Sequence, residues 1–313
     1  MPLRLVVALL LMLSACAQTP PPFTAPLERD HPLVGKVWLP QAGTFIAIDD
    51  LVAQARAADA VLLGETHDNA DHHALQAWLL SRLTEGGRRP LVAFEMMDGG
   101  QADALRRYLE AHPGDAAGLG AALEWDKSGW PDWALYRPIA AAALAAGAPL
   151  ATANLTREQV RAIAKGKTVI ALPDLPPDQL ALMAGEIKDG HCGMLPDNAV
   201  PAMVSVQRSR DATMAATLAA GLREHGNAVL IAGAGHTRTD HGVPFALKRQ
   251  SPTARVLALA FIEVKAGETD PAAYGALFDS PRPPFDAVWF TPRAEREDQC
   301  EAFKRHMEKK KAG

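Results

Sequence analysis

Acidic and imidazole side chains follow three apolar runs of the kind that form buried strands. The run 60–63 leads through a glycine to Glu65 and His67, Glu95 directly follows a second run, and His236 follows a third. A carboxylate beside an imidazole can bind a metal ion, relay a proton or form an ion pair. Since the carboxyl ends of parallel strands meet at one edge of a sheet, where ligands bind, we expect these four side chains to line one cleft.

Each of these side chains also has a plainer interpretation. Glu65 and His67 stand just before a helical pattern, and the helix dipole favours acids at a solvent-exposed helix start. Glu95 either meets a partner in the cleft or turns to solvent, because a carboxylate does not face an apolar core unpaired. Neighbouring carboxylates raise each other's pKa, so we expect Glu65 or Glu95 to be poised as a general acid or base.

Two hydrolase motifs are absent from the sequence, which contains neither Gly-x-Ser-x-Gly nor His-Glu-x-x-His. The first absence disfavours a serine hydrolase with a nucleophile elbow, and the second disfavours a zinc site built on one helix. A metal ion would therefore need ligands from separate strand ends. The candidates are His67, Glu95 and His236.

A second group of donors lies further along the chain, where His191, Cys192 and Met194 stand within four residues. Haem iron accepts imidazole, thiolate and thioether ligands, so all three are candidate haem contacts. The spacing is not the Cys-x-x-Cys-His of covalently attached haem. The alternatives are core packing for the methionine and a capping hydrogen bond for His191. Arg238 either grips a carboxylate such as a haem propionate with its planar guanidinium or lies in a solvent loop.

Trp130, Trp133 and Tyr136 are spaced by three residues at the start of a helical pattern. They predict an aromatic face on that helix. Such a face can cover a flat macrocycle, and it can equally be part of an ordinary core. The sequence alone leaves both interpretations open.

The elements that must position these side chains alternate between strand and helix patterns. The predicted strands are 60–64, 91–96, 149–154, 228–233, 256–264 and 287–290. Helical patterns at 69–84 and 99–111 separate the first three, as in parallel sheets. We therefore predict an α/β fold, a mostly parallel sheet flanked by helices, in residues 31–173 and 226–295, with a small helical subdomain inserted at 174–225.

Composition excludes one class of partner. The chain has 313 residues, 48% of them hydrophobic, and a net charge of −4. Loss of residues 1–15 removes one positive charge, Arg4, and brings the net charge to −5. No basic patch precedes the last few residues, so we expect no nucleic-acid partner.

The N-terminus has the pattern of a bacterial lipoprotein signal. Arg4 precedes an apolar stretch, 5–13, that is too short for a stable membrane span, and small residues then lead to Cys16. We predict that signal peptide 1–15 is removed and that Cys16 is lipidated and held in a bilayer, with an ordinary secretory signal as the alternative. No Asp follows the cysteine as an inner-membrane retention signal, so we expect an outer-membrane anchor facing the periplasm.

Two segments flank the predicted domain. The proline-rich residues 16–30 predict an extended tether, and the charged tail 296–313 predicts an amphipathic helix or a frayed end. Cys192 and Cys300 lie far apart in sequence, so we expect two free thiols. A disulfide is the alternative, and the periplasm permits one.

Three short motifs resemble those of the ChaN family of haem-binding lipoproteins. They are, in this order, the Gly-Glu-Thr-His step at Glu65, the Phe-Glu-Met-Met step at Glu95 and the Gly-Ala-Gly-His step at His236. The ChaN family belongs to a wider group with the Tiki metalloproteases and the erythromycin esterases. The lipoprotein signal and the stretch 191–196 narrow the resemblance to the lipoprotein branch.

The resemblance implies a three-layer α/β core with a small helical subdomain, and a dimer that holds haem between its subunits. It also implies a tyrosine ligand for haem iron. The mature chain offers Tyr108, Tyr136 and Tyr274, and we select Tyr136 for its aromatic neighbours.

Two functions follow from this resemblance. The first is an outer-membrane-tethered haem-binding protein that takes part in haem or iron acquisition beneath an outer-membrane haem receptor. The alternative is a hydrolase of the Tiki or erythromycin esterase type, in which Glu65, His67, Glu95 and His236 bind a divalent metal ion or activate water. Both functions can hold at once, with haem at the helical subdomain and a polar cleft on the sheet.

Overall fold

The computed structural model describes residues 19–305 apart from residues 169, 171, 173, 299, 302 and 303. The predicted signal peptide and the predicted lipidation site, Cys16, lie outside the described residues. The end of the charged tail also lies outside them.

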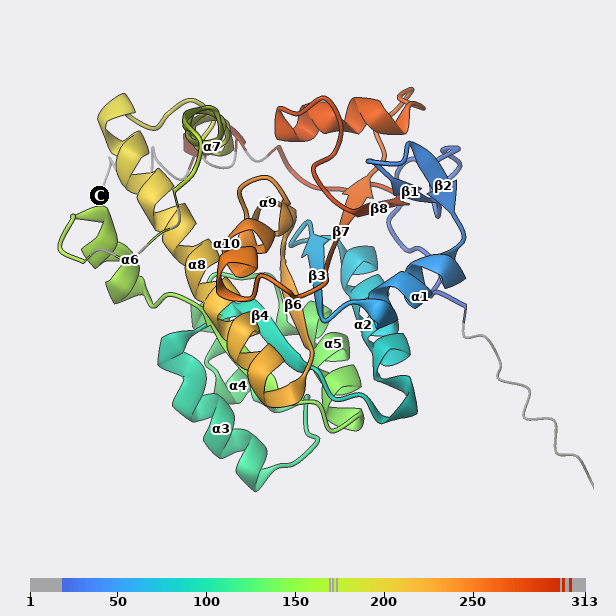
Figure 1. The fold of residues 1–313 in the computed structure, drawn as a ribbon, viewed down its shortest axis with the longest axis vertical. Helices are drawn as coiled ribbons and strands as arrows, with labels where there is room; N and C mark the ends of the chain where they lie inside the picture. Colours follow the sequence, from blue (N-terminus) through green and yellow to red (C-terminus); the bar gives the residue numbers. More distant parts are fainter. Residues whose placement is uncertain are drawn as a thin grey trace, which may run out of the picture.

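Eight strands form one sheet in the order β2-β1-β8-β7-β3-β6-β4-β5 (Figure 1). They are β1 (Val37–Leu39), β2 (Thr44–Ile46), β3 (Ala60–Glu65), β4 (Leu91–Asp98), β5 (Leu150–Asn154), β6 (Ala228–Gly233), β7 (Val256–Glu263) and β8 (Ala287–Thr291). The strands from β8 to β5 in this order pair in parallel. The β1–β2 hairpin adds an antiparallel edge at β8. The prediction of a mostly parallel sheet is confirmed.

Helices cover both faces of this sheet (Figure 1). The α-helices are α1 (Ile48–Ala57), α2 (Ala70–Thr84), α3 (Ala102–Ala111), α4 (Leu119–Ala122), α5 (Trp133–Ala145), α6 (Arg157–Ala164), α7 (Pro177–Gly190), α8 (Val200–His225), α9 (Ala234–Thr237) and α10 (Val243–Gln250). The 3₁₀ helices are η1 (Glu85–Gly87), η2 (Gly99–Gln101), η3 (Trp125–Lys127), η4 (Asp197–Ala199) and η5 (Pro271–Phe278). Helices α1, α2 and α5 share a core with one face of the sheet, and α8 and α10 share a core with the other.

The apolar strands explain this layering. Successive side chains of a strand point to opposite faces, so a strand buried on both sides is apolar throughout. In β3, Leu63 joins the core that contains Leu79 of α2, whereas Leu62 joins the core that contains Leu218 of α8. Burial of each such leucine contributes about 1.5–3 kcal/mol. The two cores hold the sheet rigid, and the side chains at its carboxyl edge are positioned accordingly.

The segment predicted as a helical subdomain divides into two parts. Met214 and Leu218, in the second half of α8, lie in the core beneath the sheet. Helix α7 and the first half of α8 pack on each other and extend beyond the sheet (Figure 1). We call this projecting part, residues 177–208, the cap. Among the residues that the structure describes, no helix is long and apolar enough to span a membrane.

The described part of the predicted tether lies against the body of the protein. The carboxylate of Asp71 accepts hydrogen bonds from the backbone N–H groups of Thr24 and Ala25, at 2.7 and 2.9 Å. Leu27 forms an isolated β-bridge with Arg293. Residues 19–30 are therefore packed on the body, in contrast to the extended spacer that their composition predicts.

The two cysteines of the described chain form a disulfide, Cys192–Cys300, across a sequence separation of 108 residues. The expectation of two free thiols is therefore wrong. Separation along the chain was a poor guide, because the residues after β8 run back to the cap and bring the two Cα atoms to 5.5 Å. The bond fastens the C-terminal segment to the loop that follows α7.

Candidate functional site

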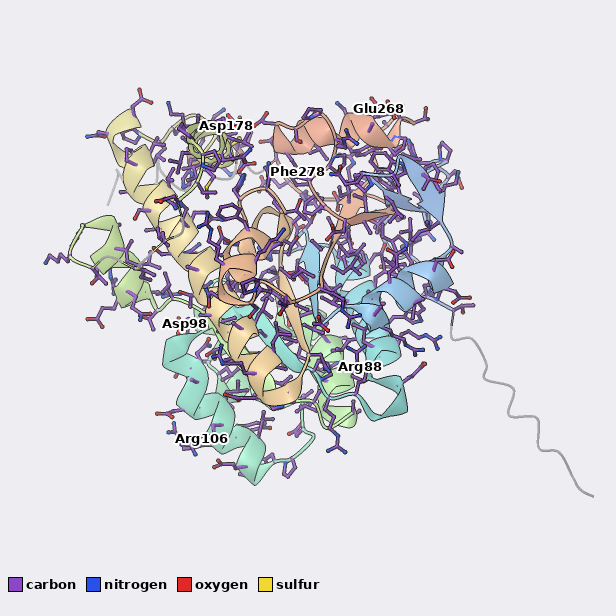
Figure 2. All side chains as sticks on the ribbon, viewed as in Figure 1. Arg88, Asp98, Arg106, Asp178, Glu268 and Phe278 are labelled. Atoms are coloured by element: carbon purple, nitrogen blue, oxygen red, sulfur yellow. A yellow bond between two sulfur atoms is a disulfide. The ribbon has the colours of Figure 1, made fainter. Side chains whose placement is uncertain are left out.

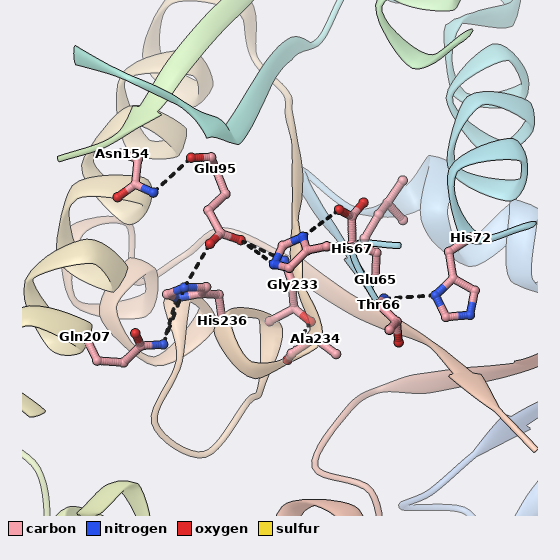
Figure 3. Close-up of polar contacts among 12 residues, drawn as sticks. Glu65, Thr66, His67, His72, Glu95, Asn154, Gln207, Gly233, Ala234 and His236 are labelled. Carbon is pink, nitrogen blue, oxygen red and sulfur yellow. Dashed lines mark hydrogen bonds and ion pairs between the residues drawn. The ribbon is translucent and has the colours of Figure 1, made fainter. Parts of the chain in front are cut away.

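The structure brings Glu65, His67, Glu95 and His236 together at the carboxyl edge of the sheet (Figure 3). Glu65 is the last residue of β3, and Glu95 lies on β4. Strand β6 lies between these two strands, and His236 lies on α9, which directly follows β6. The register of β3 and β6 places Glu65 opposite Gly233. We refer to these four residues as the acid–histidine cluster.

Glu65 is buried among three donors. Its Oε1 lies 2.9 Å from Nδ1 of His67 and accepts a hydrogen bond at 3.0 Å from the hydroxyl of Tyr136. Its Oε2 lies 3.3 Å from Nδ1 of His73. Burial by itself raises the pKa of Glu65, but the charges and hydrogen bonds of His73 and His67 outweigh it and hold this pKa well below its usual range. Glu65 is therefore a carboxylate at neutral pH.

Glu95 has an equally specific set of partners. Its Oε1 lies 3.2 Å from Nε2 of His236, and its Oε2 accepts a hydrogen bond at 2.8 Å from the backbone N–H of Gly233. Nε2 of His67 lies 4.0 Å from the same Oε2. Burial raises the pKa of Glu95, but His236 and His67 together lower it to about 2. The expectation that the two glutamates raise each other's pKa is wrong, because imidazoles contact both of them.

His236 lies between two buried carboxylates. Its Nδ1 is 2.6 Å from Oδ1 of Asp211, and its Nε2 faces Glu95. Burial lowers the pKa of His236, but Glu95 and Asp211 raise it to about 10. The ring is therefore an imidazolium at neutral pH, held in place by α8 on one side and β4 on the other.

Asp211 escaped the sequence analysis. It lies on α8 and is 3% exposed. A signal for it exists in the sequence, because Asp211 falls on the same helical face as the buried Met214, Ala215 and Leu218. An acid on an apolar face needs a partner, and here that partner is His236.

His67 is the most exposed member of the cluster, with 33% of its side chain accessible. Its ring packs against that of Trp130, with 4.9 Å between centroids. Burial lowers the pKa of His67, but the hydrogen bond to Glu65 and the charge of Glu95 raise it above its ordinary value. Glu65 holds Nδ1, which leaves Nε2 as the ring atom on the side of Glu95. An imidazole oriented in this way can accept or donate a proton at Nε2.

The donor types of the cluster suit a metal ion, but their arrangement does not. Within the described ranges, no group of three His, Cys, Asp or Glu side chains is placed to hold one. Nε2 of His236 faces Glu95, and Nδ1 of His67 faces Glu65. The predicted metal set of His67, Glu95 and His236 is therefore a network of ion pairs in this structure.

Tyr136 is not placed to bind iron. Its side chain is fully buried, and its hydroxyl donates to Glu65. Burial and the charge of Glu65 raise the pKa of this phenol far above its ordinary value, so it does not form a phenolate. Trp125 packs in the same core against Trp133 and Tyr136 of α5. Of the aromatic neighbours that favour Tyr136 in the sequence, Trp133 belongs to this ordinary core, whereas Trp130 is half-buried and packs against His67.

A cavity of about 450 Å³ lies beneath the cap. We call it the cap cavity. Met183 and Ile187 of α7 line one side, and Leu277 and Phe278 at the end of η5 line another. Figure 2 labels Phe278 at this end of the molecule. His191 also lines the cavity. The structure therefore contains a recess between the cap and the sheet domain in which these apolar side chains lie beside charged ones such as Glu186 and Asp189.

The remaining predicted haem contacts differ in their placement. Arg238 lines the cap cavity but is fully buried and pairs with Glu186 and Asp240, so its guanidinium is already engaged by protein carboxylates. Cys192 is bound in the disulfide, so it offers no thiolate. Met194 is half-buried in the loop after α7, where its backbone N–H donates to the carbonyl of His191 at 3.0 Å.

Comparison with known proteins gives a family and a fold. Residues 51–247, more than half of the chain, match the model of a family described as haem-binding uptake, Tiki superfamily, ChaN. No curated protein matches the chain. The structure of ChaN of Campylobacter jejuni with cofacial haem is 21% identical, has a TM-score of 0.65 and covers 81% of this chain and 95% of its own.

Two further solved structures resemble parts of this fold. The type III effector HopBA1 is 18% identical, with a TM-score of 0.46 over 84% of this chain and 99% of its own. A mutant of erythromycin esterase EreC in its open conformation is 14% identical, with a TM-score of 0.47 and the same coverage, 84% and 99%. The matched range, residues 51–247, includes all four residues of the acid–histidine cluster, and the chain belongs to the ChaN family of haem-binding uptake proteins within the Tiki superfamily.

Proposed function

We propose that this chain is a haem-binding lipoprotein, anchored in the outer membrane and facing the periplasm, that takes part in haem or iron acquisition. The observation that carries the proposal is its membership of the haem-binding ChaN family. ChaN of Campylobacter jejuni binds haem cofacially, and we extend haem binding to this chain. In our proposal, haem is cargo: the protein receives it from an outer-membrane haem receptor, holds it and passes it on.

The cap cavity is the slot that we assign to haem. Its apolar lining, from Met183, Ile187 and Phe278, suits a porphyrin face. Its volume of about 450 Å³ lies in the usual range for small-molecule pockets. A recess of this size covers only part of a macrocycle, and a second copy of the chain would cover the rest in the homodimer that we propose.

His191 is the side chain that we assign to iron. It lines the cap cavity, and its Nδ1 lies 2.7 Å from the carbonyl oxygen of Ile187. This contact orients the imidazole ring within the cavity wall, as a second hydrogen bond does for metal-ligating histidines. This is the usual arrangement of a haem-ligating histidine. His241 also lines the cavity, but its Nε2 lies 3.3 Å from a carboxylate oxygen of Glu186.

The N-terminal segment supports the proposed anchor. Cys16 precedes the first described residue, Thr19, by three positions, which is at most about 11 Å of extended chain. The segment then packs on the body through Thr24, Ala25 and Asp71. Acyl chains on Cys16 would therefore hold the body close to the bilayer surface.

A haem titration of the chain lacking residues 1–16 tests the proposal. We expect a Soret band that saturates with haem and weakens strongly in His191→Ala. The matched control is His112→Ala, which removes an exposed histidine far from the cap cavity. Absence of a saturable Soret band in the unmodified protein would refute haem binding, and an unchanged band in His191→Ala would refute the ligand assignment. Mass spectrometry of the membrane fraction tests lipidation at Cys16.

A second function is favoured by the orientation of His67. Glu65 holds its Nδ1, its Nε2 faces Glu95, and 33% of its side chain is accessible. We propose that His67, oriented by Glu65, catalyses the hydrolysis of an ester. Water adds to the carbonyl carbon while one of its protons passes to Nε2 of His67. The C–O bond of the ester then breaks, and the departing alkoxide takes that proton from His67. Because the pKa of His67 is raised, the rate should increase as pH rises through that pKa.

Hydrolysis of p-nitrophenyl acetate by the same soluble chain tests this function. We expect His67→Ala and Glu65→Gln to abolish turnover, while His112→Ala leaves it unchanged. A rate that is equal in the unmodified protein and His67→Ala would overturn the assignment. Loss of turnover on addition of a chelator would instead assign the reaction to a divalent metal ion.

A further inference from the structure

A second cavity lies at the carboxyl ends of β4 and β5, and we call it the strand-end cavity. Its volume is about 420 Å³. Its walls include Glu95 and Asn154 from the sheet, Trp130 from the loop before α5 and Arg210 from α8. Asp98, which also lines it, is labelled in Figure 2 at the end of β4. The cavity therefore shares Glu95 with the acid–histidine cluster.

Arg210 lacks a partner in this cavity. Its Nε is buried and has no hydrogen-bond acceptor among the described residues, and no described carboxylate pairs with its guanidinium. Other arginines of the chain are engaged: Arg238 pairs with two carboxylates, and Arg157 donates to two backbone carbonyls. A buried guanidinium N–H without an acceptor is costly, and an anion in the cavity would supply one.

The carboxylates on the walls of the cavity already have partners. Glu95 contacts an imidazole and a backbone N–H. Asp98 accepts from a backbone N–H at the start of η2, and Glu124 pairs with Lys127. Among the described cationic side chains that line this cavity, Arg210 is therefore the one with a buried N–H that has no acceptor, because Arg157 donates to backbone carbonyls and Lys127 pairs with Glu124.

We propose that the strand-end cavity binds a small organic anion, whose carboxylate or phosphate group is held by Arg210 and whose uncharged body lies against Trp130. A planar guanidinium pairs with either oxyanion through two parallel hydrogen bonds. An indole ring offers a large apolar surface to the rest of the molecule. The carboxylates elsewhere on the walls repel a second negative group, so the ligand carries its charge at one end.

This site is distinct from the slot assigned to haem. Gln207 and Asp211 of α8 line the cap cavity, whereas Arg210 of the same helix lines the strand-end cavity. Trp130 also packs against His67, so a bound molecule lies beside the accessible imidazole of the cluster. If the proposed hydrolase function holds, the inference also names its substrate class, namely esters that carry an acidic group at one end.

Calorimetric titration of the soluble chain with benzoate and phenyl phosphate tests the inference, with benzyl alcohol as the uncharged probe and inorganic phosphate as the probe without an apolar body. We expect both aromatic anions to bind and benzyl alcohol not to bind. Arg210→Gln should weaken anion binding at least about tenfold, and Arg210→Lys should weaken it less. Arg161→Gln, an exposed arginine on α6, is the matched control and should bind as the unmodified protein does.

Further variants separate the parts of the proposal. Trp130→Leu should weaken benzoate binding and leave the affinity for inorganic phosphate unchanged. Equal affinity in the unmodified protein and Arg210→Gln, or no binding of either aromatic anion, would overturn the inference. The haem titration of Arg210→Gln should match that of the unmodified protein. A failure of haem binding is therefore distinguishable from a failure of the anion site.

Discussion

Replacing Tyr136 by phenylalanine distinguishes two roles for this residue, a structural one and that of an iron ligand. The Tyr136 hydroxyl donates to Oε1 of Glu65 at 3.0 Å, and the side chain is fully buried. A hydrogen bond to an ionised group contributes about 1.5–3 kcal/mol, and phenylalanine fills the same space without leaving a cavity. We therefore expect Tyr136→Phe to lower the free energy of unfolding at pH 7 by about 1.5–3 kcal/mol.

The pH dependence of this effect has a definite sign. The pKa of Glu65 is lower in the folded state than its ordinary value of 4.5, so its ionisation adds stability above pH 4.5 that is lost as pH falls. Loss of the hydroxyl raises the folded-state pKa of Glu65 and reduces this contribution. The difference between the two proteins should therefore shrink on acidification, and it should also shrink in a Glu65→Gln background.

Urea denaturation followed by circular dichroism measures the decrease in the free energy of unfolding. A haem titration of the same proteins shows whether Tyr136 also binds iron. Tyr136→Phe should keep the Soret band of the unmodified protein. Tyr108→Phe is the control, because its half-exposed hydroxyl donates to Asp115 and its removal should cost less. An unchanged urea midpoint together with a lost Soret band would show that Tyr136 binds iron and that our reasoning from burial is mistaken.

Other perturbations test the rest of the scaffold. Replacing Cys192 and Cys300 by serine should lower the free energy of unfolding by up to about 5 kcal/mol, because the bond closes a loop across 108 residues; an unchanged urea midpoint would contradict this. Glu95, with a folded-state pKa of about 2, should add stability above pH 4.5 that is lost as pH falls towards 2, so thermal unfolding of Glu95→Gln should depend less on pH in that window. Gly64→Ala places a Cβ in steric conflict with Oγ1 of Thr237 and should cost about 1–3 kcal/mol in urea denaturation, a loss that Thr237→Ala should partly relieve.

Much of the cluster could be predicted from the sequence. Apolar runs that end in polar residues identified β3, β4 and β6, and the convergence of parallel strands at one edge placed Glu65, Glu95 and His236 together. The protonation of the cluster could not be predicted. His73 and His67 lower the pKa of Glu65, and His236 and His67 lower that of Glu95. The positions of these imidazoles depend on the register of the strands and on α2 and α9.

The sequence by itself determined the main strands, the order in which acidic and imidazole side chains follow them, and the family, because these depend on local periodicity and on short motifs. Only the tertiary structure decided which partner each polar group has. Asp211 meets His236 because α8 packs on β6 and β4 there, and Tyr136 meets Glu65 because α5 packs against α2. Cys192 meets Cys300 because the chain after β8 returns to the cap. These contacts join residues far apart in sequence, and local periodicity carries no information about such pairs.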